Sequence, residues 1–200
     1  MKILKDRKYK IWLAPGVAAV LAALTLIIAP SVLPMPTLTV IKVLATVPIA
    51  AILPILEALF KRELSIGVNI LITSHAVLSI DLGSAFGFYS LVPFWDIFLH
   101  AYFGLVGAAA LALLMELLLR NDESPLFRAI FLFLAVMGCA GLWEIFEFTT
   151  DAIFSADAQC VKEAIARGEN PIADTMWDII VTAVGAVIYL PSLFIKRRNS

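Results

Sequence analysis

Six long apolar segments alternate with short polar segments along the 200-residue chain. The apolar segments cover residues 11–29, 38–60, 64–82, 93–119, 126–150 and 172–195. Each is long enough to cross a hydrocarbon core of about 30 Å as an α-helix. The pattern therefore predicts an all-α polytopic membrane protein with six transmembrane helices, which form a single membrane domain over residues 1–200.

The longest polar segment lies between the last two predicted spans. Within it, Ala158, Val161 and Ile165 recur at helical spacing among charged residues. This spacing predicts a short amphipathic helix over residues 156–167 that lies on the membrane surface. Asp81, at the outer end of the third span, is expected to be a solvated charge.

The basic residues indicate the orientation of the chain. If the N-terminus is cytoplasmic, all but Lys42, Lys162 and Arg167 of the 15 Lys and Arg residues fall on the cytoplasmic side. Cytoplasmic loops carry the excess of positive charge in membrane proteins. We therefore expect both termini in the cytoplasm, and a multi-pass protein of the inner membrane.

Composition excludes several classes of protein. Hydrophobic residues make up 62% of the chain, charged residues 16%, and the mean hydropathy is +0.96, which is far too apolar for a soluble domain. The sequence has no basic patch for nucleic acid, no Walker loop and no dinucleotide fingerprint. We expect the lipid bilayer as a partner, and neither nucleic acid nor nucleotide.

Acids and imidazole gather in the outer halves of the predicted helices. They fall at spacings of three, four or seven residues, which place them on common helix faces. The set is Asp96 with His100, then Glu144, Glu147 and Asp151, then Asp174 with Asp178. Because ionised side chains are costly in hydrocarbon, these residues must face the bundle interior.

Two arrangements satisfy so many acids with so few basic residues nearby. Either several acids stay protonated, or a divalent cation lies among them. We favour the cation, of unassigned identity, with Asp96, His100, Glu144, Glu147 and Asp178 as ligands. Glu144, Glu147 and His100 are also candidates for general acid–base catalysis, with Asp151, Asp174 and His75 lying behind the ligands to orient them or water. Small residues are expected to let the helices approach: Gly104, Gly107, Gly138, Gly141, Gly185 and Ala186.

The order of these motifs resembles that of a known family. Asp-x-x-x-His begins one helix, Glu-x-x-Glu follows on the next, and two aspartates precede Gly185-Ala186 on the last. In this order the chain resembles the YjdF-like family of bacterial inner-membrane proteins and, more distantly, the VanZ-like proteins. VanZ-like proteins carry Asn where this chain has Thr182. Their association with glycopeptide resistance implies a substrate among the envelope lipids.

Three functions follow from these features. The first is a metal-dependent hydrolase or transferase embedded in the membrane, acting on an envelope lipid or a lipid-linked substrate. The second is an ion- or proton-coupled transporter or relay, and the third is a structural membrane partner whose acids remain protonated. The apolar inner halves of the last three spans disfavour permeation of a solute or ion through the bundle, but not a proton relay.

Overall fold

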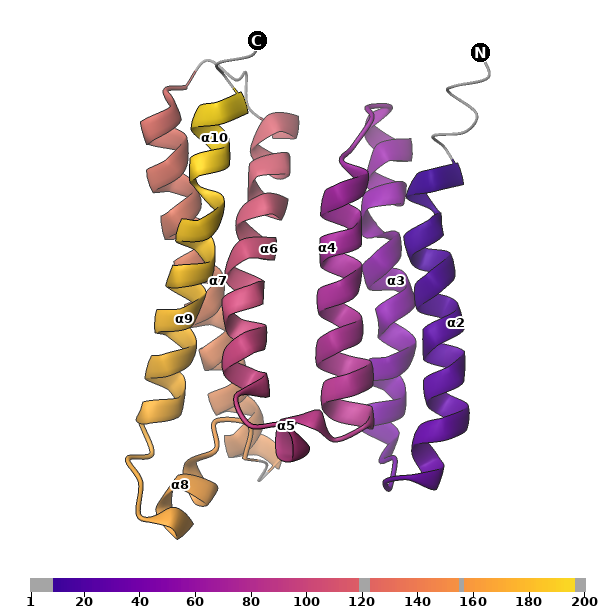
Figure 1. Cartoon of the computed structure of the whole chain (residues 1–200), viewed down its shortest axis with the longest axis vertical. Helices are drawn as coiled ribbons and strands as arrows, with labels where there is room; N and C mark the ends of the chain where they lie inside the picture. Colours follow the sequence, from indigo (N-terminus) through magenta and orange to yellow (C-terminus); the bar gives the residue numbers. More distant parts are fainter. Residues whose placement is uncertain (1–8, 119–122, 155–156, 197–200) are drawn as a thin grey trace. The chain divides into compact units, whose positions relative to one another are not determined.

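A computed structural model describes residues 9–118, 123–154 and 157–196, and in these residues it is helical without strands (Figure 1). The chain divides into two compact units, Met1–Trp95 and Asp96–Ser200. Several predicted features lie outside the described residues: the basic N-terminal segment, Arg120, residue 156 and the last two arginines.

The first unit contains a bundle of three spanning segments. Its elements are α2 (Leu13–Ile28), the 3-10 turn η1 (Ala29–Ser31), α3 (Thr37–Phe60), α4 (Ile66–Ala76), η2 (Val77–Ala85) and α5 (Phe88–Leu91). Local chemistry explains two of the boundaries. Lys61 has a left-handed φ of 53° and ends α3, and the Ser65 hydroxyl accepts a hydrogen bond from the Val68 amide at 3.3 Å where α4 begins.

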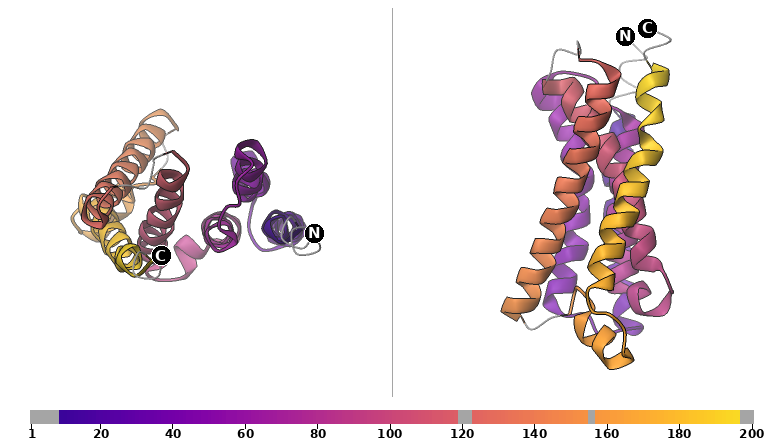
Figure 2. Two further views of the ribbon diagram at one scale, coloured as in Figure 1. Left: turned by 90° about the horizontal axis from the view of Figure 1, so that it is seen from above. Right: turned by 90° about the vertical axis from the view of Figure 1, so that its left-hand side faces the viewer.

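Small apolar side chains form the core of this unit. Ala22 of α2, Ala29 of η1, Val43 of α3 and Ala85 of η2 make one buried cluster. Figures 1 and 2 show α2, α3 and α4 running side by side. Because these side chains are short, the helix backbones pack closely, as is usual where the hydrophobic effect contributes little between helices.

The third span is not a uniform α-helix. After Ala76 it continues as the π-helix η2, and the Phe86 amide donates to the carbonyl oxygen five residues earlier, at Asp81, over 3.0 Å. Asp81 is only 1% exposed. The expectation of a solvated charge at this position was wrong, because the wider helix turns Asp81 into the bundle.

The second unit contains the other three spans. Its elements are α6 (Trp95–Leu118), α7 (Pro125–Phe154), α8 (Val161–Arg167), α9 (Ala173–Tyr189) and α10 (Pro191–Lys196). Pro125 begins α7, where its missing N–H costs nothing, and the Ser124 hydroxyl accepts a hydrogen bond from the Phe127 amide at 3.2 Å. The short helix α8 covers less than the predicted 156–167.

Helices α6, α7 and α9 meet along two buried apolar layers. Ala108, Val136 and Ala186 form the first layer, one residue from each helix. Ala112, Met115 and Leu132 form the next, against α9 and α10. Figure 2 shows these helices packed together within the unit.

Six helices of the described chain are long and apolar enough to cross a membrane. They are Tyr9–Ser31, Thr37–Phe60, Ile66–Ala85, Trp95–Leu118, Pro125–Phe154 and Ala173–Phe194. Many of their large apolar side chains are exposed, including Ile27, Leu59, Leu134 and Phe148. Such surfaces are favourable in lipid and unfavourable in water. The prediction of an all-α fold with six potential spans is therefore confirmed.

Candidate metal centre

Chain direction brings the acids of the second unit to one end of it. Helices α6 and α9 begin at this end and α7 finishes there, with α8 in the connection between α7 and α9 (Figure 1). Asp96 and His100 lie in the first two turns of α6, and Asp178 in the second turn of α9. Residues far apart in the sequence therefore converge.

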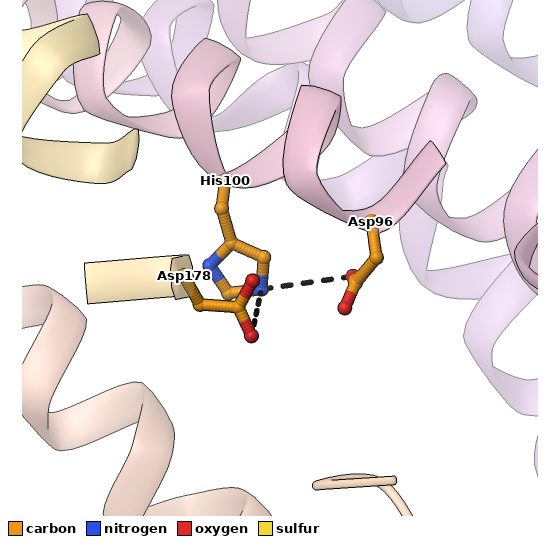
Figure 3. A group of neighbouring side chains, drawn as sticks. All are labelled: Asp96, His100 and Asp178. Carbon is orange, nitrogen blue, oxygen red and sulfur yellow. Dashed lines mark ion pairs between the residues drawn. The ribbon is translucent and has the colours of Figure 1, made fainter. Parts of the chain in front are cut away.

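Asp96, His100 and Asp178 form a three-residue cluster (Figure 3). One ligand atom from each lies within 4.8 Å of the other two. The Nε2 atom of His100 is 3.7 Å from Asp96 Oδ1 and 3.7 Å from Asp178 Oδ2. These separations are too long for hydrogen bonds but suit two ligands that share an ion, with each about 2.1 Å from it.

The three side chains of the cluster differ in their exposure to solvent. The side chain of Asp178 is 2% exposed, that of His100 12%, and that of Asp96 35%. Asp178 Oδ1 is buried and makes no hydrogen bond in the described chain. A buried carboxylate oxygen without a donor is costly, and a cation would satisfy it. Asp96 provides the open side of the cluster.

Helices α6 and α9 approach closely at this point. A Cβ on Gly104 would overlap the Thr182 carbonyl oxygen, and a Cβ on Gly185 would overlap the Ala101 carbonyl oxygen. Only glycine permits this contact between backbones. The two glycines therefore set the separation between His100 and Asp178.

The other glycines behave differently. A Cβ added to Gly138 or Gly141 of α7 would have no neighbouring atom within 4 Å, so the expectation that these glycines allow close packing was wrong. A Cβ on Gly107 would make ordinary contacts, the nearest to Phe103 at 3.8 Å and to Val136 at 3.9 Å. Ala186 is fully buried in the first apolar layer. Among these positions, backbone approach that excludes a Cβ is confined to the α6–α9 pair.

Thr182 is a positioning residue that the sequence interpretation did not assign. It is fully buried, and its hydroxyl donates to the His100 carbonyl oxygen at 3.2 Å. The bond ties α9 to α6 one turn beyond Asp178. Thr182 follows Asp178 by four residues, so the sequence could have placed both on one face of α9. The hydrogen bond itself could not be predicted, because it requires α6 to lie beside this face.

Glu144 is the buried acid of α7. It is 7% exposed, and its Oε2 atom has no hydrogen-bond partner in the described residues. Its charge lies within Coulombic range of both His100 and Asp178. Glu144 is therefore placed to act on the cluster without being one of its three closely spaced groups.

Glu147 and Asp174 lie near the cluster but are not among its three closely spaced residues. Glu147 Oε1 accepts a hydrogen bond from Trp143 Nε1 at 2.9 Å, one turn earlier on the same helix. Asp174 is half-buried, and both carboxylates lie within Coulombic range of Asp178. Five carboxylates thus influence one another at this end of the unit: Asp96, Glu144, Glu147, Asp174 and Asp178.

Asp151 and His75 have different surroundings from the cluster. The Asp151 carboxylate accepts the backbone N–H groups of Ala158 at 2.7 Å and Gln159 at 3.0 Å, so it stabilises the connection that follows α7. His75 lies on α4, within the other compact unit. The predicted roles of both residues behind a metal remain predictions.

Comparison with known proteins identifies a family. A family model described as "Predicted membrane protein (DUF2238)" matches residues 5–199. No curated protein and no solved structure matches the chain. Since the family model spans nearly the whole sequence, the chain belongs to this family of predicted membrane proteins.

Proposed function

We propose that Asp96, His100 and Asp178 bind a divalent cation at the outer side of the inner membrane, and that the bound ion serves hydrolysis or transfer on a lipid-linked phosphate. The separation of the three ligand atoms, all within 4.8 Å, carries this proposal. Two carboxylates and one imidazole form a donor set for Mg²⁺, Mn²⁺, Fe²⁺ or Zn²⁺. The unpaired Asp178 Oδ1 supports the presence of a cation.

Each residue has a separate role in this proposal. A divalent cation supplies a Lewis acid and an activated water when it is bound. Glu144, buried beside the cluster, is the candidate general base, because its charge lies within range of His100 and its Oε2 is unpaired in the described chain. Asp96, the most exposed of the three ligands, lies on the side from which a substrate can enter.

The apolar surroundings favour a lipid substrate. Trp143 and Phe146 of α7 are exposed next to Glu144 in the sequence, and their rings contact at a centroid distance of 5.4 Å. Met176 and Trp177, also exposed, precede Asp178 on α9. A lipid phosphate could therefore reach the cluster while its hydrocarbon chains remain in the membrane.

A transport function receives less support. Two buried apolar layers follow the cluster along α6, α7 and α9, formed by alanine, valine, leucine and methionine side chains. Conduction of an ion requires polar groups or water along its path. Within the described residues of this unit, the packed layers instead separate the cluster from the other end.

Elemental analysis of the protein purified in mild detergent tests the metal site. We expect the wild type to retain a divalent metal at close to one ion per chain, and Asp178→Asn to lose it. Glu169→Gln is the matched control, since Glu169 is an exposed acid of the same unit. A wild type that retains no metal after resupply, or an Asp178→Asn variant that retains as much as wild type, would contradict the proposal.

A second assay tests the reaction. Phosphate release from a lipid diphosphate in mixed micelles should depend on added divalent metal and fall in Glu144→Gln, which keeps the size of the side chain but cannot act as a base. Metal content of the same variant separates a lost base from a lost metal. Metal binding without release from any lipid phosphate would retain the site and refute the proposed reaction.

A further inference from the structure

Asp81 occupies an unusual position in the first unit. The third span changes from α-helix to π-helix at Val77, and hydrogen bonds within η2 skip five residues, as between the Phe86 amide and the Asp81 carbonyl at 3.0 Å. The Ser84 hydroxyl likewise approaches the Ser79 carbonyl, five residues earlier, at 3.5 Å. π-helical turns within an α-helix are rare and frequently occur at functional sites.

The π-helix determines which residue faces the bundle. Thr73 and Ala76 of α4 are buried, and the next buried position is Asp81, five residues further. A continuing α-helix would bring Ile80 to that face, because side chains four apart lie above one another. The wider turns therefore bury the Asp81 carboxylate at this position, while Ile80 stays partly buried against the core cluster.

Asp81 is buried in the bundle beside the Thr25 hydroxyl. It is 1% exposed, and neither carboxylate oxygen has a well-aligned hydrogen-bond partner in the described chain. The Thr25 side chain of α2, itself 4% exposed, lies beside it. The apolar cluster of Ala22, Ala29 and Ala85 surrounds this part of the bundle.

The helices packed against η2 contain few titratable groups. Helix α2 has none within Leu13–Ile28. Helix α3 contains Lys42, which is exposed, and Glu57, whose carboxylate accepts the Leu64 amide at 2.9 Å near the opposite end of the helix. Helices α4 and α5 contribute His75 and Tyr89. No hydrogen bond joins any of them to the Asp81 carboxylate in the described residues.

We propose that Asp81 is a proton-binding site, which holds a proton at neutral pH and donates it in a hydrogen bond to the Thr25 hydroxyl oxygen. An ionised carboxylate here would have no neighbouring cation in the described residues and only the Thr25 hydroxyl as a side-chain donor, which is a costly arrangement in an apolar bundle. Protonation removes the charge and provides one O–H donor. The neighbouring hydroxyl supplies the acceptor.

Proton binding at Asp81 is linked to the packing of α2 against η2. Loss of the proton would leave a charge between these helices with the Thr25 hydroxyl as its neighbouring side-chain donor, and one hydroxyl is too little to replace the solvation of a carboxylate. The site belongs to the first unit and uses none of the candidate metal ligands. The proposal for Asp81 therefore does not depend on the proposed enzymatic function.

Infrared difference spectroscopy tests the proposal on the full-length protein. A protonated carboxyl group has a C=O stretching band that an ionised group lacks, and we expect one such band to disappear at neutral pH in Asp81→Asn. Asn has nearly the same shape and no charge, so this variant should fold and unfold thermally like the wild type. Glu169→Gln, which changes an exposed acid, should lose no such band.

A second variant keeps Asp81 and removes its proposed acceptor. Thr25→Val should retain the band of the protonated acid and change its frequency, because the hydrogen bond is lost. Identical bands in wild type and Asp81→Asn at neutral pH would overturn the proposal, since Asp81 would then be ionised. An unchanged frequency in Thr25→Val would overturn the assigned hydrogen bond.

Discussion

The acidic side chains at one end of the second unit differ in the hydrogen-bond partners of their carboxylate oxygens. Asp178 and Glu144 each bury an oxygen that has no hydrogen-bond partner in the described chain. Glu147 accepts a hydrogen bond from Trp143, and Asp151 accepts two backbone N–H groups. Acids already satisfied by the protein have less need of a cation, so Glu147, which the sequence analysis grouped with Asp178 and Glu144 as a ligand, differs from both in the structure.

This difference predicts an order of effects on metal affinity. Asp178→Asn removes a ligand and should lower affinity by more than ~100-fold, beyond the range typical for groups that act through a neighbour. Glu147→Gln should lower it by only about 10-fold, because the Glu147 carboxylate is held by Trp143. Competition with a chelating dye measures both. Equal losses in the two variants would show that Glu147 leaves Trp143 to bind the ion.

At the scale of helices, the candidate centre depends on the contact between α6 and α9. Gly104 and Gly185 face the backbone of the opposite helix, and Thr182 donates to the His100 carbonyl oxygen in the same region. His100 and Asp178 lie on opposite sides of this contact. A change in helix separation would therefore alter the cluster directly.

Substitution of these glycines should separate the helices. We expect Gly104→Ala or Gly185→Ala to destabilise the fold by about 1–3 kcal/mol, as overpacking does, and to weaken metal binding. Thermal unfolding in detergent and metal content measure the two effects.

Matched controls are available on α7. Gly138→Ala and Gly141→Ala place the new methyl group where no atom lies within 4 Å. They should leave metal binding unchanged and stabilise the helix by up to about 1 kcal/mol. Destabilisation in all four variants would indicate that the α6–α9 contact has no special role.

At the scale of the whole molecule, the distribution of basic residues predicts the orientation in the membrane. In a cysteine-free background, Cys139→Ala with Cys160→Ser, an introduced Glu169→Cys should react with a membrane-impermeant maleimide in intact cells. Arg62→Cys should react only after permeabilisation, because it lies in the turn between the second and third spans. Glu169 and Arg62 are both exposed. The reverse labelling pattern would invert the topology and place the metal cluster on the cytoplasmic side.

The periodicity and length of the apolar segments were sufficient to predict the helices. Long apolar runs must form helices in a membrane, since every backbone polar group has to be satisfied within the segment. The spacing of Asp96 and His100 likewise determined that they share a face of α6. These are local properties, set by neighbours along the chain, and so they can be read from residue order.

Contacts between helices decided the rest. Residue order assigned Asp178 and Glu147 alike as ligands, whereas in the structure Asp178 meets His100 and Glu147 accepts a hydrogen bond from Trp143. It did not reveal that Gly104 and Gly185 permit close approach whereas Gly138 and Gly141 contact nothing. Nor did it indicate that a π-helix turns Asp81 inward. Sequence alone determined a chain of six apolar helices with acids gathered near one end of the last three. Only tertiary packing selected the side chains that meet, because helix rotation and separation depend on the neighbouring helices.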